Sequence, residues 1–265
     1  MSDRGVQPQA TAELDEAWSR TAPARAAREI LVCGVLAPLI AAYARREVVG
    51  AHRLDGLPAP VVFVANHSSH VDTPVLLRSL PARWRRRTIV AAAADYFYGS
   101  RAVAAAVSLA FATVPVRRAL GTGGAGSPAH IGPLIEAGWS LLLFAEGTRS
   151  RDGRLGPMLP GAAGMAARHR VPIVPVHLSG TREMMPKGRN WLVGRPRLRR
   201  ADRPTIAITI GAPIAVGPDD DRLQAMEEVR LFMADCGALT TPDPRLGLPR
   251  EPAAHNRPQA LEASD

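Results

Sequence analysis

The stretch that most constrains this chain runs from Val61 to Pro74, VVFVANHSSHVDTP. Five apolar or small residues lead into polar ones, which predicts a fully buried strand followed by a turn. Asp72-Thr73-Pro74 then predicts a helix start, with Asp72 as N-cap and proline in the first turn. His67 and Asp72 would face apart on a strand and lie about 140° apart around a helix, so only a turn brings them together. A histidine held by a carboxylate is a good general base, which makes this pair a catalytic candidate.

Taken alone, these residues also fit a polar cluster without catalytic role, in which Asp72 only caps the helix. A second stretch, SLLLFAEGTRSRDG at residues 140–153, favours function because it is another buried strand that runs into a polar turn. Strands that end in such turns are typical of the carboxyl edge of an open parallel sheet, where α/β folds bind ligands. We therefore predict an α/β fold, a single domain with a mostly parallel sheet flanked by helices and preceded by an N-terminal membrane-associating helix.

Four short motifs follow one another between roughly Val48 and Cys236: NHxSxxD at 66–72, VPVRR at 114–118, FxEGTR at 144–149 and VPIVPV at 171–176. Together they resemble the glycerolipid (PlsC-like) acyltransferase family, of the 1-acyl-sn-glycerol-3-phosphate acyltransferase type. Any one of these motifs is a weak signal, whereas the order and spacing of all four make the resemblance specific.

The resemblance implies an O-acyltransferase that moves a fatty acyl group from a thioester to the hydroxyl of a lyso-phospholipid. The donor would be acyl-CoA or an acyl carrier protein, and the favoured acceptor is 1-acylglycerol 3-phosphate, which gives phosphatidic acid. His67 is then the general base and Asp72 fixes its tautomer. We expect direct transfer rather than an acyl-enzyme, because the sequence has no G-x-S-x-G elbow. We expect neither a metal nor a cofactor.

The same resemblance implies roles for further residues. It places the acceptor phosphate near Arg118 and Arg149, other acceptor contacts on Glu146, Gly147 and Thr148, and supporting roles on Asn66, Ser69 and Pro175. Two positions depart from the family: Leu159 stands where a lysine is common, and Ala145 where a proline is frequent. We still expect a phosphorylated acceptor, held mainly by the two arginines. The rival is another lyso-lipid or hydroxyl acceptor, for which the missing lysine is an adaptation.

Other patterns allow different functions. Gly121 to Gly126 reads GTGGAG, and Glu146 lies twenty residues further on, which imitates the fingerprint of a dinucleotide-binding oxidoreductase. Four residues separate these glycines from the preceding strand, so a surface loop explains them better. The three aspartates 219–221 favour a helix start over a metal site. A catalytically silent membrane-surface protein is the non-enzyme alternative.

The composition limits the classes of partner that the protein can bind. The formal net charge is +9, and Lys187 is the only lysine among 33 basic residues. Such a surface suits nucleic acid, anionic lipid or an anionic small molecule, but no nucleic-acid motif is present and we expect no nucleic-acid partner. Arg83 to Arg87 is either a solvated face or, with Trp84 inside it, a contact for anionic headgroups. Cys33 and Cys236 are far apart and lack metal-ligand spacing, which fits a reducing compartment.

Membrane attachment is expected from Ile30 to Ala44, ILVCGVLAPLIAAYA. Its fifteen residues fall short of the roughly 20 that cross a bilayer, and arginines flank it, which favours a helix lying in the membrane surface. A buried core helix and a cleaved signal peptide are the alternatives. We predict a peripheral or monotopic protein at the cytoplasmic face of the cell membrane. The expected segments are a polar arm (1–27), an interfacial apolar helix (28–45), an acyltransferase domain (46–240) and a Pro-rich disordered tail (241–265).

Overall fold

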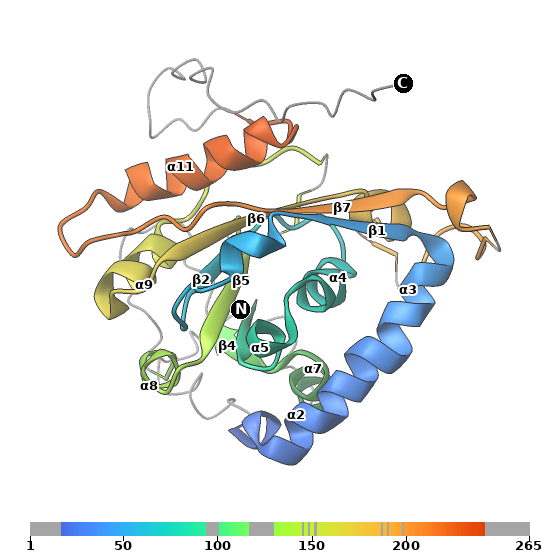
Figure 1. The fold of residues 1–265 in the computed structure, drawn as a ribbon, viewed down its shortest axis with the longest axis horizontal. Coiled ribbons are helices and arrows are strands. Elements are labelled where there is room, and N and C mark those ends of the chain that lie inside the picture. Colours follow the sequence, from blue (N-terminus) through green and yellow to red (C-terminus); the bar gives the residue numbers. More distant parts are fainter. Residues whose placement is uncertain are drawn as a thin grey trace, which may run out of the picture.

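The computed structural model describes residues 17–93, 101–116, 130–144, 146–147, 149–150, 153–186, 188–189, 191–197 and 199–241. Its centre is a seven-stranded sheet in the order β1-β7-β6-β2-β5-β3-β4 (Figure 1). The strands are β1 Arg45–Val49, β2 Val62–Ala65, β3 Thr88–Ala93, β4 Thr113–Val116, β5 Ser140–Phe144, β6 Ile173–Ser179 and β7 Thr205–Ile210. Neighbouring strands run parallel except β6 and β7, which confirms the predicted mostly parallel sheet.

The register of the central strands decides which turns meet. Ala65, the last residue of β2, lies beside Phe144 of β5 on one side and Val176 of β6 on the other. The residues that follow these three strands therefore emerge at one edge of the sheet, the carboxyl edge. All four residues of β2 are buried, as expected for a central strand covered on both faces.

Helices cover both faces of the sheet (Figure 1). One core packs α8 Gly132–Glu136, α9 Gly161–His169 and α11 Arg222–Asp235 against the strands. The other lies beneath α4 Asp72–Ser79 and α5 Ala82–Arg85, with α7 Arg101–Phe111 beside them. The short helix α10 Thr181–Met184 follows β6 directly. Asp221 accepts a hydrogen bond from the Leu223 N–H at 2.8 Å, so this aspartate starts α11 as its N-cap.

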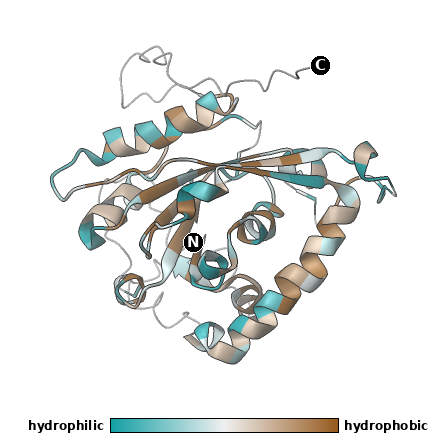
Figure 2. Cartoon of the chain, in the orientation of Figure 1, coloured by the Kyte–Doolittle hydropathy of each residue, from teal (hydrophilic) through white to brown (hydrophobic). Residues whose placement is uncertain are grey.

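The N-terminal helix is longer than the apolar run in the sequence. It is continuous from Ala22 to Tyr43, built from α2 Ala22–Glu29, the π-helical segment η2 Ile30–Leu36 and α3 Ala37–Tyr43. The π-helical segment ends just before Pro38, where a proline lacks the N–H that an α-helical turn requires. Most of the helix between its ends is coloured as apolar or neutral (Figure 2). Among the described residues it is the one helix long and apolar enough to cross a membrane, by length and composition alone.

Two local expectations need correction. From its sequence, Val48 to Leu54 is expected to be the first strand, but the strand is Arg45–Val49, because Gly50 adopts φ +80° and Ala51–Leu54 forms a 3-10 turn. Trp84 does not sit on the surface within the basic run: it is 2% exposed and packs edge-to-face on Phe63, with ring centroids 5.7 Å apart. It is therefore a core residue and not a membrane contact.

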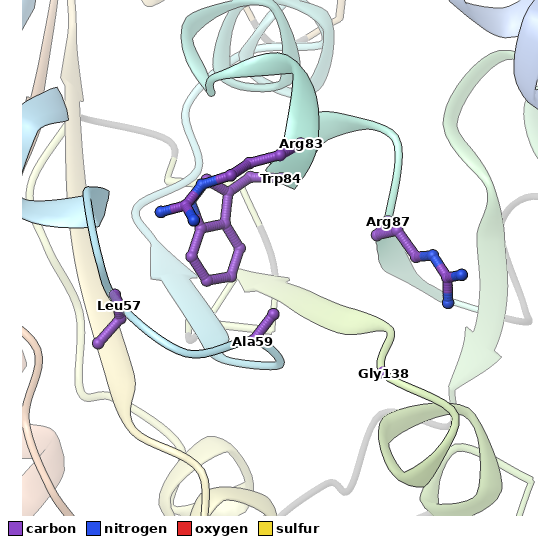
Figure 3. Close-up of a pocket in the computed structure, with 6 residues that line it drawn as sticks. All are labelled: Leu57, Ala59, Arg83, Trp84, Arg87 and Gly138. Carbon is purple, nitrogen blue, oxygen red and sulfur yellow. The ribbon is translucent and has the colours of Figure 1, made fainter.

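The basic run from Arg83 to Arg87 borders a hollow at the edge of the sheet opposite to the carboxyl edge. This hollow, of about 220 Å³, is lined by Leu57, Ala59, Arg83, Trp84, Arg87 and Gly138 (Figure 3). Ala59 and Gly138 precede β2 and β5, which places the hollow at the amino edge. Arg83 lies across Trp84, with its guanidinium carbon 5.0 Å from the ring centroid. The opening is therefore separate from the turns that carry the predicted chemistry.

Candidate active site

The turn after β2 brings His67 and Asp72 together, as their spacing predicts. Nδ1 of His67 lies 2.8 Å from Oδ2 of Asp72. The carboxylate is fully buried, whereas the His67 side chain is 20% exposed. An ionised carboxylate only accepts hydrogen bonds, so Nδ1 carries the proton and Nε2 keeps its lone pair. The geometry therefore suits a general base that removes a proton at Nε2.

The Asp72 carboxylate also organises the backbone of the turn. Its Oδ2 accepts hydrogen bonds from the N–H groups of Ser68 at 2.7 Å and Ser69 at 2.8 Å. The predicted N-cap role is wrong: Val71, with φ −81° and ψ −6°, occupies the cap position, and no side chain caps the helix. Because α4 begins at Asp72 itself, the carboxylate points back to the turn instead of forward to the helix. One oxygen thus fixes both the histidine and the backbone that carries it.

The predicted supporting residues Asn66 and Ser69 tie this turn to β6 and α10. The Asn66 amide donates to the Leu178 carbonyl at 2.9 Å and accepts from the Leu178 N–H at 2.8 Å. The Ser69 hydroxyl donates to the Met185 carbonyl at 2.8 Å. Pro175, the third predicted supporting residue, lies inside β6 beside Val64, so it belongs to the sheet rather than to the turn.

The FxEGTR motif at the end of β5 contacts the turn after β2 from the other side. The Glu146 carboxylate accepts hydrogen bonds from the N–H groups of His67 at 3.3 Å and Gly156 at 3.0 Å. The Ser150 N–H donates to the His67 carbonyl at 2.8 Å. Phe144 stacks on the His67 ring, with centroids 4.0 Å apart and planes 20° apart. No role was predicted for Phe144, although its place at the end of a strand in this motif is a usable signal.

Gly147 adopts a conformation that a side chain would strain. Its φ is +67°, and an added Cβ would lie 2.9 Å from Cδ1 of Leu159. Leu159, where the resemblance in sequence leads us to expect a lysine, lies beside this glycine. The departure from the family therefore falls within this site.

Arg149 supplies positive charge near the histidines. Burial lowers the pKa of His70 below its usual value, and the positive charge of Arg149 acts in the same direction. His70 is therefore neutral at pH 7, and Arg149 lies close enough to repel a proton on it. The other predicted site residues, Arg118 and Thr148, lie outside the described residues, as does the glycine stretch from Gly121 to Gly126. The strand before Arg118, β4, ends at Val116 at the same carboxyl edge.

No group of three His, Cys, Asp or Glu side chains among the described residues is placed to hold a metal ion. The profile of the Acyltransferase family matches residues 46–179, just over half of the chain and all of the turns above that are described. The chain belongs to the Acyltransferase family. The matched range includes all four of the predicted motifs.

Plant proteins of the family show the same likeness. The chain is 31% identical over 155 residues to the chloroplastic 1-acyl-sn-glycerol-3-phosphate acyltransferase BAT2 of Brassica napus, covering 58% of this chain and 43% of that protein. It is 30% identical over 153 residues to the chloroplastic LPAT1 of Arabidopsis thaliana, covering 58% and 41%. The matched region thus spans less than half the length of these two curated relatives.

A solved structure confirms the fold of this family member. The crystal structure of the 1-acyl-sn-glycerophosphate (LPA) acyltransferase PlsC from Thermotoga maritima aligns with a TM-score of 0.56 and 19% identity. The alignment covers 90% of this chain and 84% of that chain. The predicted architecture, including an N-terminal apolar helix ahead of the sheet, is therefore confirmed.

Proposed function

We propose that this family member transfers a fatty acyl group from an acyl thioester to the hydroxyl of a lyso-phospholipid. The single observation that carries the proposal is the His67–Asp72 pair, whose 2.8 Å contact leaves Nε2 as the base at the carboxyl edge. The relatives that the chain matches are named as 1-acyl-sn-glycerol-3-phosphate acyltransferases. The product of that reaction would be phosphatidic acid.

The proposed chemistry needs one base and no protein nucleophile. Nε2 of His67 takes the proton of the acceptor hydroxyl as its oxygen attacks the thioester carbonyl carbon. Asp72 stabilises the imidazolium that forms. The C–S bond then breaks, and the leaving thiolate takes the proton from Nε2. The neighbouring hydroxyls are engaged elsewhere: Ser68 Oγ lies 3.1 Å from Thr181 Oγ1, and Ser69 bonds the Met185 carbonyl.

The proposed acceptor carries a phosphate, bound by Arg149 and by Arg118. Two arginines can hold one phosphate bidentately, which compensates in part for the absent lysine at Leu159. A single missing charge-assisted hydrogen bond is worth roughly 1.5–3 kcal/mol, so binding weakens without being lost. The donor is acyl-CoA or an acyl carrier protein.

The test measures KM and kcat with 1-acylglycerol 3-phosphate and with its dephosphorylated form. Thiol release reports turnover, and Arg149→Ala and Leu159→Lys are assayed beside the parent. We expect Arg149→Ala to penalise only the phosphorylated acceptor, and Leu159→Lys to lower KM for that acceptor. Preference of the parent for the dephosphorylated lipid, or equal damage to both acceptors by Arg149→Ala, would contradict the phosphate assignment and favour another lyso-lipid.

We also propose that the protein works on a membrane surface, at the cytoplasmic face, through the helix Ala22–Tyr43. Ile30 of this helix is 70% exposed, and Val35 is exposed as well. Large exposed apolar side chains on a helix flanked by arginines suit the boundary between headgroups and acyl chains. High salt should then loosen the protein from membranes. Resistance to both salt and alkaline washing would instead show a spanning helix.

A further inference from the structure

An exposed basic segment lies at the C-terminal end of the N-terminal helix. Between residues 188 and 203 the structure describes six arginines and a single acidic residue, Asp202. We call this segment the arginine loop; its basic residues are Arg189, Arg195, Arg197, Arg199, Arg200 and Arg203. All of these except Arg203 are exposed. The structure places this charge beside the end of the N-terminal helix.

Hydrogen bonds fasten the arginine loop to the end of α3. The Arg197 N–H donates to the Ala42 carbonyl at 3.0 Å. The Arg203 guanidinium donates to the Ala41 carbonyl at 2.6 Å and to the Arg197 carbonyl at 2.8 Å. These bonds satisfy carbonyls that a helix end leaves without partners. The loop and the helix therefore keep a fixed relation to each other, and Figure 1 shows them meeting beside β1 and β7.

Apolar side chains are exposed in the same segment. Trp191 is 65% exposed, and Val193 is exposed while its N–H donates to the Met184 carbonyl at 2.8 Å. A tryptophan that a protein leaves in water is unusual, and at a bilayer interface its ring is stable because one edge is apolar and one is polar. A tryptophan among arginines thus matches the zone where headgroups meet acyl chains.

We propose that the arginine loop is a second membrane contact, which docks on anionic phospholipid headgroups with Trp191 at the interface. The inference rests on the proposed membrane attachment of the helix Ala22–Tyr43 and extends it. A single helix lying on a bilayer leaves the protein free to roll about the helix axis. The arginine loop, fastened to one end of the helix, supplies the second point that sets how the catalytic edge faces the lipid.

The partner favoured by the observations is an anionic bilayer rather than nucleic acid. Both the helix and the loop expose large apolar side chains, and a nucleic acid offers nothing for Ile30 or Val35 to bury. Each arginine near an anionic surface changes the partition coefficient by about fivefold, so neutralising two of them should cost about 25-fold.

The experiment uses the full chain and vesicles of phosphatidylcholine with or without phosphatidylglycerol. The loop variant is Arg195→Gln with Arg199→Gln. The matched control, Arg168→Gln with Arg222→Gln, removes the same charge from exposed positions on α9 and α11, on the other face of the sheet. We expect the loop variant to lose about 25-fold in partitioning on anionic vesicles and nothing on neutral ones. The control should bind like the parent, and Trp191→Phe should remove a blue shift of tryptophan emission on anionic vesicles.

Three results would overturn the proposal: parent-like binding of the loop variant, an equal loss in the control, or a loss seen with duplex DNA but not with vesicles. Thiol release with detergent-dispersed substrates separates this inference from the proposed function. The loop variant should keep the parent's rate there, because neither arginine touches the candidate site. A parent that releases no thiol contradicts the enzyme assignment, whereas its vesicle binding still decides the role of the loop.

Discussion

Replacement of Asp72 by asparagine removes the charge at the candidate site while keeping the shape of the side chain. Oδ2 of Asp72 accepts three hydrogen bonds, from His67 Nδ1 and from the N–H groups of Ser68 and Ser69. Oδ1 is buried and has no hydrogen-bond partner among the described residues. The asparagine oxygen can take over the three bonds, which puts the amide NH2 where Oδ1 was, without an acceptor.

The cost to stability follows from that orphaned amide. A buried donor without a partner costs about 1–3 kcal/mol, against a usual free energy of unfolding of about 5–15 kcal/mol. Asp72→Asn should therefore fold, with a lowered melting temperature. Asp72→Ala is the poorer probe, because it leaves two backbone N–H groups of the turn without an acceptor.

The effect on activity should be larger than the effect on stability. Without the carboxylate, the imidazolium that forms at His67 loses its counter-charge, and kcat/KM should fall by about 10²–10⁴-fold. Because Asp72 acts through His67, Asp72→Asn should cost little further activity in a His67→Ala background. Thiol release measures the rate, and urea unfolding of each variant measures the stability.

This reasoning fails if Asp72→Asn is fully active, since Asp72 would then only shape the turn. It also fails if Asp72→Asn lowers the residual rate of His67→Ala as strongly as it lowers the parent rate. Such additivity would mean that the carboxylate acts independently of the histidine.

Three further predictions follow from the same structure. His67→Ala should lower the rate by about 10²–10⁴-fold, whereas His70→Ala should cost far less; equal losses in two folded variants would defeat the assignment of the base. Gly147→Ala should destabilise the protein by about 1–3 kcal/mol. Adding Leu159→Ala should remove the contact between the new Cβ and Leu159 but not the strain of the positive φ at residue 147. A complete rescue of stability in urea unfolding would therefore contradict the strain argument. Burial lowers the pKa of His177 below 6.5. As the pH falls below 6.5, the unfolded chain therefore binds a proton that the native state does not bind, and the stability of the native state falls. His177→Gln should flatten the decline in urea midpoint between about pH 6.5 and 5, and an unchanged slope would exclude His177 as the source of the decline.

The parts of the fold that could be predicted are those that neighbouring residues in the sequence determine. The strand before Asn66 and the helix after Asp72 could be predicted because an apolar run and an Asp-Thr-Pro start stand side by side. The meeting of His67 with Asp72 follows from the same turn. The contact of Glu146 with the His67 N–H could not be predicted, since the two residues are 79 positions apart and meet only through the pairing of β2 with β5.

Charged residues within the N-terminal helix made its predicted length too short. A count of apolar residues starts at Ile30, yet the helix begins at Ala22 and includes Arg28 and Glu29. Arg28 is buried and donates to the carbonyls of Leu109 and Ser108, and Glu29 pairs with Arg85. Partners that lie far along the chain satisfy these charges, so hydrophobicity alone cannot find the start of the helix.

The place of β1 in the sheet has a consequence for how the chain is made. β1 follows the apolar helix directly, but Arg45 pairs with Thr205, which is 160 residues later in the sequence. At about 5–20 residues per second, a ribosome needs about 8–32 s to produce that partner strand after β1 has emerged. During this interval β1 has no strand to pair with. A nascent chain captured by a membrane through its helix would hold β1 at the bilayer until β7 arrives, so the sheet would close on the lipid surface.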